Sequence, residues 1–320
     1  MPGPVLNDQP PLPQAPAPEQ IVSARESDRA KLRQRAKYFV LFLAGLVICF
    51  GKPLLGLFRL SLNSELNSHV FLMPAVSLYL VWLDKRKLTP LFEPAPRLAA
   101  SLLLPGIGLL AAYCAAISSG WKPHEADFLS LMTLAFLFCF SGGFAFFFGG
   151  GILRAVAFPM AFLIFMVPLP VVLENGLMNF LQHSSAEASY LLLKLSGMPV
   201  FREGTQFTLP GVSIEVAPEC SGIRSSLVLF ITGILAAYLF LRQRWSRITL
   251  AAALIPLGIL RNAVRIFTLA QLAVNVNPDI LNSALHHRGG PLFFAVSLAP
   301  FFLLIWFLRK CEARQNKTAG

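Results

Sequence analysis

Charged side chains are scarce in this chain: Asp, Glu, Lys and Arg together make up 13% of its 320 residues. A soluble domain usually carries about a quarter of charged residues. Hydrophobic residues make up 55%, and they gather in runs of about twenty, the length that a helix needs to cross a bilayer. Lipid offers no partner to an unpaired backbone group, so such runs are expected to be helical. The composition excludes an ordinary soluble domain and predicts an integral membrane protein.

The chain also lacks the patterns of nucleic-acid and metal sites. Its net charge is +11, but Lys and Arg stand in short clusters between the apolar runs, where the positive-inside rule places them. No basic face with interleaved aromatic residues is present. The five cysteines form no CxxC pair and no metal-ligand spacing. We therefore expect the lipid bilayer as a partner, and no nucleic acid, no metal and no other cofactor.

The apolar runs predict an all-α polytopic membrane protein, a bundle of about eight transmembrane helices. They cover roughly residues 38–58, 69–83, 98–118, 128–149, 153–173, 220–241, 248–272 and 291–308. The second run is short, and Pro159, Pro168 and Pro170 are expected to kink or end the fifth, because proline removes a backbone donor. With eight spans, the segments on one side hold 18 Lys and Arg, and those on the other side hold five. This excess predicts that both termini are cytoplasmic.

Three regions divide the chain. Residues 1–37 are predicted to be a disordered, basic cytoplasmic leader, because the first part is rich in Pro, Gln and Ala and the rest in Lys and Arg. No short apolar core follows Met1, so we do not interpret the leader as a secretory signal peptide. Residues 38–310 are predicted to form a single transmembrane domain, and residues 311–320 a short cytoplasmic tail.

Only one long segment, residues 174–219, is predicted on the outer side. Its first part, 178–195, has apolar residues at mixed helical spacing, which favours a helix along the membrane interface. In residues 200–216, apolar and polar side chains alternate on either side of turn residues. That pattern predicts a small extracytoplasmic hairpin just before the sixth span.

One cysteine has unusual neighbours. Cys220 lies in the run 218–224, which reads Pro-Glu-Cys-Ser-Gly-Ile-Arg and leads into the sixth span. The start of a helix favours negative charge through its free N–H groups and its dipole, so a thiol there is expected to react readily as the thiolate. On this motif alone, the alternative is a packed cysteine beside a serine N-cap, with Arg224 as a structural counter-ion.

Two arginines lie late in the seventh span. Arg261 and Arg265 are four residues apart and therefore share one face of the helix. Charged groups within a span are costly, and they mark either a functional site or a paired structural one. The structural alternative pairs them with acids such as Glu174 or Glu187. The functional alternative makes them a clamp for an oxyanion or a carboxylate.

Two histidines, His286 and His287, precede a glycine pair at the outer entrance of the eighth span. No Asp or Glu accompanies them at metal-ligand spacing, so a metal site is not expected. The alternation of spans brings Cys220, Arg265 and His286 to one membrane face. A thiolate nucleophile, a proton-transferring imidazole and an oxyanion-stabilising guanidinium are what acyl transfer through a thioester requires.

The run at 218–225, followed by Asn-Ala-Val-Arg at 262–265 and then by His286, resembles the exosortase/archaeosortase family. The resemblance is most specific over residues 217–294. Cys220 matches the family nucleophile, Arg265 the family arginine and His286 the family histidine, which tends to stand four residues before a glycine. Arg261 remains an alternative to Arg265, and His287 remains an alternative to His286.

This resemblance implies a cysteine peptidase and transpeptidase in the cytoplasmic (inner) membrane of a prokaryote, with an active site that faces the exterior. Its expected partners are membrane-anchored substrate proteins that end in a Pro-Glu-Pro (PEP-CTERM type) motif, a hydrophobic helix and a basic tail. The cleaved protein would pass to an unidentified acceptor at the cell surface.

The strongest alternative is a non-enzymatic transporter or scaffold of a surface-polysaccharide export system. Its intramembrane arginines would bind an anionic substrate, so Arg261 and Arg265 would matter and Cys220 would not. Other intramembrane proteases fit poorly, because the chain has no HExxH and no GxGD motif. Ser141 and Gly142 also lack the Gly-x-Ser-Gly context of a rhomboid-like site.

Overall fold

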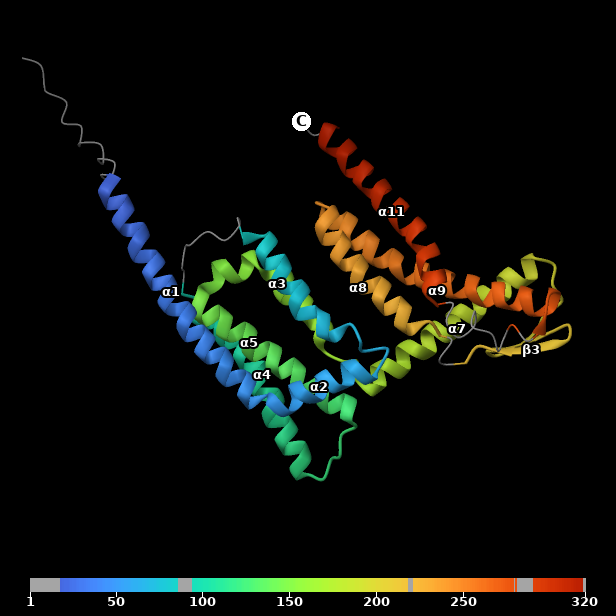
Figure 1. Cartoon of the computed structure of the whole chain (residues 1–320), viewed down its shortest axis with the longest axis horizontal. Helices are drawn as coiled ribbons and strands as arrows, with labels where there is room; N and C mark the ends of the chain where they lie inside the picture. Colours follow the sequence, from blue (N-terminus) through green and yellow to red (C-terminus); the bar gives the residue numbers. More distant parts are fainter. Residues whose placement is uncertain (1–17, 86–93, 218–220, 279, 281–289, 319–320) are drawn as a thin grey trace, which may run out of the picture. The chain divides into compact units, whose positions relative to one another are not determined.

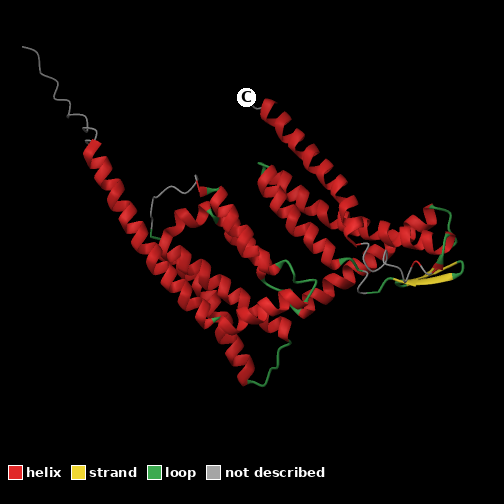
Figure 2. Cartoon of the chain, viewed as in Figure 1, coloured by secondary structure: helices red, strands yellow, loops and turns green. Residues whose placement is uncertain are grey.

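The computed structural model describes residues 18–85, 94–217, 221–278, 280 and 290–318, and most of them are helical (Figure 1, Figure 2). The helices are α1 (Pro18–Cys49), α2 (Gly51–Asn63), η1 (Val70–Leu72), α3 (Met73–Leu83), α4 (Pro96–Ser118), α5 (Glu125–Ala155), α6 (Ala157–Phe162), η3 (Leu163–Met166), α7 (Val171–Leu195), α8 (Ile223–Phe240), α9 (Arg244–Asn275) and α11 (Gly290–Thr318). The strands are β1 (Phe201–Glu203), β2 (Gln206–Leu209) and β3 (Val212–Glu215). The prediction of an all-α polytopic architecture is confirmed.

Five described helices are long and apolar enough to cross a membrane, namely α4, α5, α8, α9 and the 292–315 part of α11. The number rises to seven if two interrupted pairs, α1 with α2 and α6–η3 with α7, each form one span. The predicted span at 69–83 is only η1 followed by α3, a short apolar helix. The prediction of about eight spans therefore exceeds what the described helices provide.

The interruptions have local causes. The predicted fifth span is not one helix, because η3 ends at Met166 and α7 begins at Val171, on either side of Pro168 and Pro170. Those prolines were expected to end the helix, and they do so because neither has an N–H to donate. The predicted first span is likewise divided, between α1 and α2, just before Pro53.

The basic leader differs from its prediction. Helix α1 begins at Pro18, so residues 18–37 are helical rather than disordered and run without a break into the first apolar segment. Residues 1–17 lie outside the described part of the chain. Ala, Glu, Lys, Arg and Gln dominate the helical part, and all of them have high intrinsic helix propensity. Their low hydrophobicity indicated disorder, but it did not prevent a helix.

The chain divides into two compact units. The first holds the residues up to Leu55 together with Pro74–Lys122 and Leu131–Ile164. Within it, α1 packs on α5 through aromatic rings: Phe39 lies with its ring centroid 5.0–6.0 Å from four phenylalanine rings of α5. Gly143 makes room for Phe42, whose ring a Cβ there would meet. This unit is held together by apolar packing.

The second unit holds Gly56–Met73, Pro123–Ser130 and the residues from Phe165 onward. Its largest buried cluster joins α8, α9 and α11 through Leu229, Leu241, Leu250, Leu254, Phe301, Ile305 and Leu308. Each of these side chains is at least 95% buried. Gly233 allows α8 to approach α9 closely, because a Cβ at that position would collide with Leu254. The three helices therefore form one rigid core.

A small antiparallel sheet follows α7, with the strand order β1-β2-β3. Phe207 of β2 pairs with Arg202 of β1 and with Ile214 of β3. One face of the sheet packs on α7 and α9: Phe207 and Val216 lie against Ala186 and Ile266. The strand pairing of the predicted hairpin is thus confirmed and extended by one strand, and α7 supports the sheet. The outer location of the sheet and the interfacial position of α7 stay predictions.

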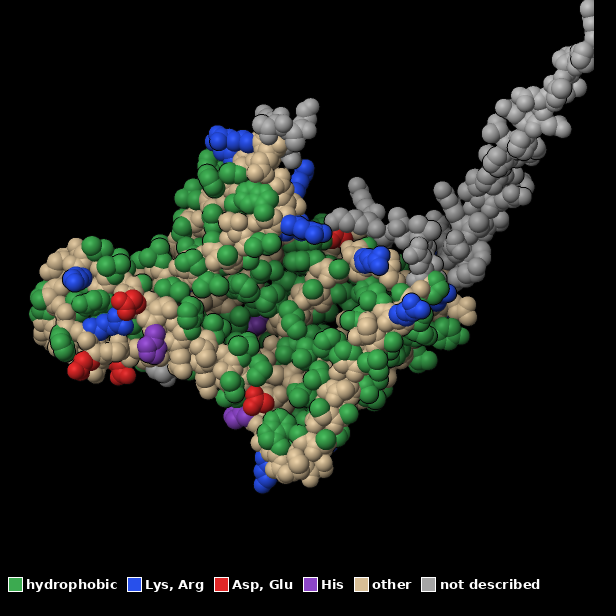
Figure 3. Space-filling model, turned by 180° about the vertical axis from the view of Figure 1, so that it is seen from behind, with side chains coloured by type: hydrophobic (Ala, Val, Ile, Leu, Met, Phe, Trp, Pro, Cys, Tyr) green, Lys and Arg blue, Asp and Glu red, His purple; other side chains and the backbone are tan. Residues whose placement is uncertain are grey.

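The outer surface of the helices is apolar. Leu104 of α4 is 65% exposed and Phe302 of α11 is 56% exposed, and Figure 3 shows a face on which hydrophobic side chains greatly outnumber charged ones. Water would not favour such a surface, whereas lipid covers it without cost. The chain is therefore a multi-pass membrane protein.

Candidate active site

Of the residues that the sequence singled out, the structure describes the two arginines. Cys220, His286 and His287 lie outside the described residues. Arg261 and Arg265 lie one turn apart on α9, where Arg261 is 7% exposed and Arg265 is half-buried. The candidate site is therefore built from the described residues on either side of Cys220 in the sequence and from the α9 face that meets them.

Arg261 is bound to the first turn of α8. Its Nη2 donates to the Gly222 carbonyl oxygen and to Ser226 Oγ, each at 3.3 Å. Its other terminal nitrogen, Nη1, is buried and has no hydrogen-bond partner among the described residues. One half of this guanidinium thus holds α8 in place, while the other half keeps its hydrogen-bonding capacity.

Gly222 is the N-cap of α8, two residues after Cys220 in the sequence. Its φ is +74°, in the left-handed region that side chains other than glycine rarely occupy. A Cβ at this position would also lie 2.9 Å from Cγ and Oδ1 of Asn262. Only glycine lets α8 begin this close to α9, so Gly222 is a fixed point on the C-terminal side of Cys220.

Val216 is the corresponding fixed point on the N-terminal side. Its N–H donates to the Thr205 carbonyl oxygen at 3.0 Å, and its own carbonyl oxygen accepts a 2.5 Å hydrogen bond from Gln182 Nε2 of α7. Val216 is 1% exposed and Gln182 is 8% exposed. Both polar atoms of the Val216 backbone are thus satisfied inside the protein, six residues before Gly222.

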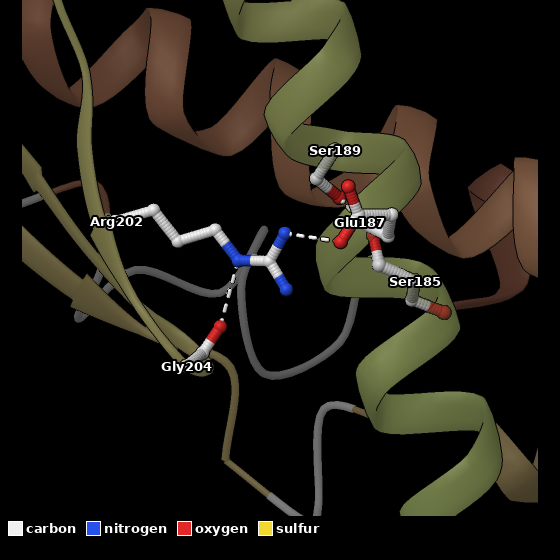
Figure 4. A network of polar contacts seen from close by, with 5 residues as sticks. All are labelled: Ser185, Glu187, Ser189, Arg202 and Gly204. Carbon is white, nitrogen blue, oxygen red and sulfur yellow. Dashed lines mark hydrogen bonds and ion pairs between the residues drawn. The ribbon is translucent and has the colours of Figure 1, made fainter.

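Helix α7 holds Val216 and also packs on α9, the helix that contacts Gly222. Its buried residues Ser185 and Ser189 are small, which brings it close to α9, and Ser189 Oγ lies 3.4 Å from the Ala263 carbonyl oxygen. Glu187 of α7 is exposed and forms an ion pair with Arg202 of β1, with 2.5 Å between Glu187 Oε2 and Arg202 Nη1 (Figure 4). The Nε of Arg202 donates to the Gly204 carbonyl oxygen. The sheet, α7 and α9 are therefore tied to one another beside Arg261.

The acids proposed as structural partners of the arginine pair have other positions. Glu187 binds Arg202, as described above, and no described contact joins Glu174 to either arginine of α9. Arg224, proposed as a counter-ion near Cys220, forms an exposed ion pair with Glu65 from the segment between α2 and η1. Arg261 therefore has no carboxylate partner among the described residues.

Three contacts of this region were absent from the sequence analysis. Gln182, Asn262 and Glu65 approach the residues around Cys220 from elements that are distant in sequence. Asn262 belongs to the Asn-Ala-Val-Arg run that carries the resemblance, but that run does not predict its approach to Gly222. Gln182 and Glu65 stand in ordinary polar contexts, and nothing in their spacing reports their partners.

No group of three or more His, Cys, Asp or Glu side chains among the described residues could hold a metal ion. The described residues instead form a site of positive electrostatic potential. The buried guanidinium of Arg261 lies beside the start of α8, where Ser221 Oγ accepts a 3.4 Å hydrogen bond from the Ile223 N–H. The guanidinium and the helix dipole both favour a negative charge.

Comparison with known proteins agrees with this arrangement. No curated protein and no solved structure matches the chain. The sequence profile of the transmembrane exosortases matches residues 60–303, which include α8, α9 and the segments around them. This match covers about three quarters of the chain, and the protein therefore belongs to the transmembrane exosortase family.

Proposed function

We propose that the protein is a membrane-embedded cysteine transpeptidase that cleaves C-terminal sorting signals of exported proteins. The substrate would carry a PEP-CTERM type motif before a hydrophobic helix and a basic tail. Cleavage would occur at the outer face of the cytoplasmic membrane, and an acceptor at the cell surface would receive the product. The exosortase match over residues 60–303 is the observation that carries this proposal.

The environment of Cys220 supports a role as nucleophile. The chain is fixed four residues before it, at Val216, and two residues after it, at Gly222. Fixed residues on both sides of a nucleophile limit the conformations that its segment can adopt, and such preorganisation is a known source of rate enhancement. The dipole at the start of α8 and the guanidinium of Arg261 both favour a thiolate over a thiol in their vicinity.

The proposed reaction has two steps. The Cys220 thiolate attacks the carbonyl carbon of the scissile peptide bond, and Arg265 stabilises the oxyanion that forms. The C–N bond then breaks, His286 donates a proton to the leaving amine, and the substrate remains attached to sulfur as a thioester. In the second step, His286 accepts a proton from the acceptor nucleophile, which attacks the thioester and releases the thiolate.

Within each pair of candidates, one residue is preferred. Arg265 matches the family arginine, whereas one half of Arg261 is already engaged by Gly222 and Ser226. Arg261 remains the alternative for oxyanion stabilisation. His286 is preferred over His287 because it stands four residues before Gly290.

The test is processing of a tagged reporter that ends in a Pro-Glu-Pro motif, an apolar helix and a basic tail. Wild-type protein should remove the tail, seen on a gel as a loss of mass, and Cys220→Ala should remove none. Cys114→Ala is the matched control, because Cys114 is another free cysteine and lies exposed on α4. Processing that survives Cys220→Ala would refute the proposal.

The alternative function, transport or scaffolding in surface-polysaccharide export, rests on the same buried Arg261. It predicts that export of polysaccharide is lost in Arg261→Gln and Arg265→Gln but retained in Cys220→Ala. The transpeptidase proposal predicts that Cys220→Ala and Arg265→Gln abolish processing alike.

A further inference from the structure

Arg261 carries a hydrogen-bonding group that the protein itself leaves unused. The side chain is 7% exposed, and its Nη1 has no partner among the described residues although Nη2 has two. An unpaired, buried part of a cation is costly, and proteins generally retain one only where a ligand completes it. The cost is higher within a membrane span, where water is scarce.

The surroundings of this group favour an anion. Helix α8 begins beside it with Gly222 as the N-cap and no side-chain cap, so the positive end of the helix dipole adds to the guanidinium charge. Arg265 lies one turn further along the same face of α9. Three sources of positive potential thus meet at the start of α8, and no described acid contacts Arg261.

The chemistry of the ligand follows from the free donor and from the class of substrate. Nη2 is already committed to Gly222 and Ser226, and the two N–H groups of Nη1 diverge, so Nη1 can donate to one oxygen of an anion. Under the proposed function the substrate is a peptide segment, in which the anionic side chains are the carboxylates of Asp and Glu.

We propose that Arg261 Nη1 binds the side-chain carboxylate of an acidic residue in the substrate segment that is presented to Cys220. This inference rests on the proposed function and extends it from catalysis to recognition. Arg261 then has two separate tasks: Nη2 holds the first turn of α8, and Nη1 reads the charge of the substrate. Arg265 remains the group for the oxyanion, so recognition and catalysis are divided between neighbouring arginines.

A carboxylate could reach this site from two sources, the substrate or Glu219 of this chain, which lies outside the described residues. A double-mutant cycle separates them. The reporter is prepared with Glu or Gln at the acidic position of its motif, and the protein as wild type, Arg261→Gln, Arg261→Lys, Glu219→Gln and Arg244→Gln. The measured quantity is the initial rate of processing by equal amounts of inserted protein.

We expect the reporter with Gln to be processed by wild-type protein about 10- to 100-fold more slowly, the loss typical of a charged hydrogen bond. Arg261→Gln should process both reporters at the same reduced rate, and Arg261→Lys should regain part of the preference for Glu. Arg244→Gln, an exposed arginine at the start of α9, should retain the wild-type rate and the wild-type preference.

Each contrary result is distinct. Equal sensitivity of wild type and Arg261→Gln to the reporter change would place recognition of the acid elsewhere and overturn the inference. Coupling of Arg261 to Glu219 instead of to the reporter would assign the carboxylate to this chain, which also overturns it. Failure of wild-type protein to process the unaltered reporter, with normal insertion, would count against the proposed function itself. If Arg261→Gln is not inserted, Arg261→Lys alone still reports the preference.

Discussion

The two ends of the α8–α9 helix pair are closed in different ways. At the loop end, residues 241–247, Glu312 of α11 accepts hydrogen bonds from the backbone N–H groups of Arg242 at 3.1 Å and Gln243 at 2.9 Å. Arg247 donates to the Leu241 carbonyl oxygen through Nε and Nη2. Both charged side chains find their partners within the protein.

At the Gly222 end, residues 221–226 and 261–265, the buried charge is only half satisfied. Arg261 holds Gly222 and Ser226 with one nitrogen and leaves the other without a partner among the described residues. The same pair of helices thus carries one charged contact that is complete and one that is incomplete. The comparison teaches that burial alone does not distinguish the two charges, whereas unused hydrogen-bonding capacity does.

The largest effect is expected at the loop end. Glu312→Ala removes both acceptors from Arg242 and Gln243 and should lower the free energy of unfolding by about 2–4 kcal/mol, since hydrogen bonds to charged groups contribute most. Thermal unfolding of the purified protein in detergent measures this loss. Glu312→Gln, which keeps one acceptor oxygen, should lose less, and the exposed Glu203→Ala should lose almost nothing.

Processing per folded molecule should stay near the wild-type value in Glu312→Ala. A large fall in that specific activity, with the fold intact, would mean that the loop end also takes part in function. The distinction between the two ends would then fail.

An intermediate effect is expected for Gln182, which fixes Val216 before Cys220. Gln182→Met keeps the length of the side chain but leaves the buried Val216 carbonyl without its donor, a cost of about 1–3 kcal/mol. Because the residue positions the nucleophile and does not contact the substrate, the processing rate at saturating reporter should fall about tenfold. The reporter concentration for half-maximal rate should change little.

Gln271→Met is the matched control for this prediction. Gln271 is a half-buried residue of α9, and the substitution removes the hydrogen bond that it donates to Ser196 and the one that it accepts from Asn275. Neither bond reaches Val216, so the substitution should alter neither quantity. Gln182→Glu, which keeps the shape but replaces the donor by an acceptor, should resemble Gln182→Met. A normal rate in Gln182→Glu would show that the hydrogen bond to Val216 has no part in positioning.

The smallest effect is expected at the ion pair between Glu65 and Arg224. Both side chains are largely exposed, 80% and 55%, and exposed pairs contribute only about 0–1 kcal/mol. Glu65→Gln should therefore leave unfolding and processing within error of wild type. A tenfold fall in processing would extend the functional region to the segment between α2 and η1.

Much of the fold was predictable because it depends on patterns that are continuous in the sequence. Helices α4, α8, α9 and α11 follow from uninterrupted apolar runs, and the small sheet follows from alternation around turn residues. The short helix within the apolar run 69–83 and the break within the run 38–58 were harder to predict. A run of apolar residues does not show where the helix within it ends. The helical form of residues 18–37 was missed because composition indicated solubility rather than backbone conformation.

The candidate site was predictable only in part. The position of Arg261 and Arg265 on one face follows from their spacing, and their cost in a span made them conspicuous. The contacts from Gln182 to Val216 and from Glu312 to the α8–α9 loop join residues 34 and about 70 positions apart. Neither partner stands out in the sequence, and helix packing alone decides that they meet.

The most direct test of the account is to identify the atom that holds the substrate. Purified protein would be mixed with the reporter, quenched in acid, digested and analysed by mass spectrometry. We predict a peptide containing Cys220 that carries the reporter fragment as a hydroxylamine-labile thioester, and its loss in Cys220→Ala. A reporter cleaved at the wild-type rate by Cys220→Ala, or an adduct on another residue, would contradict the account.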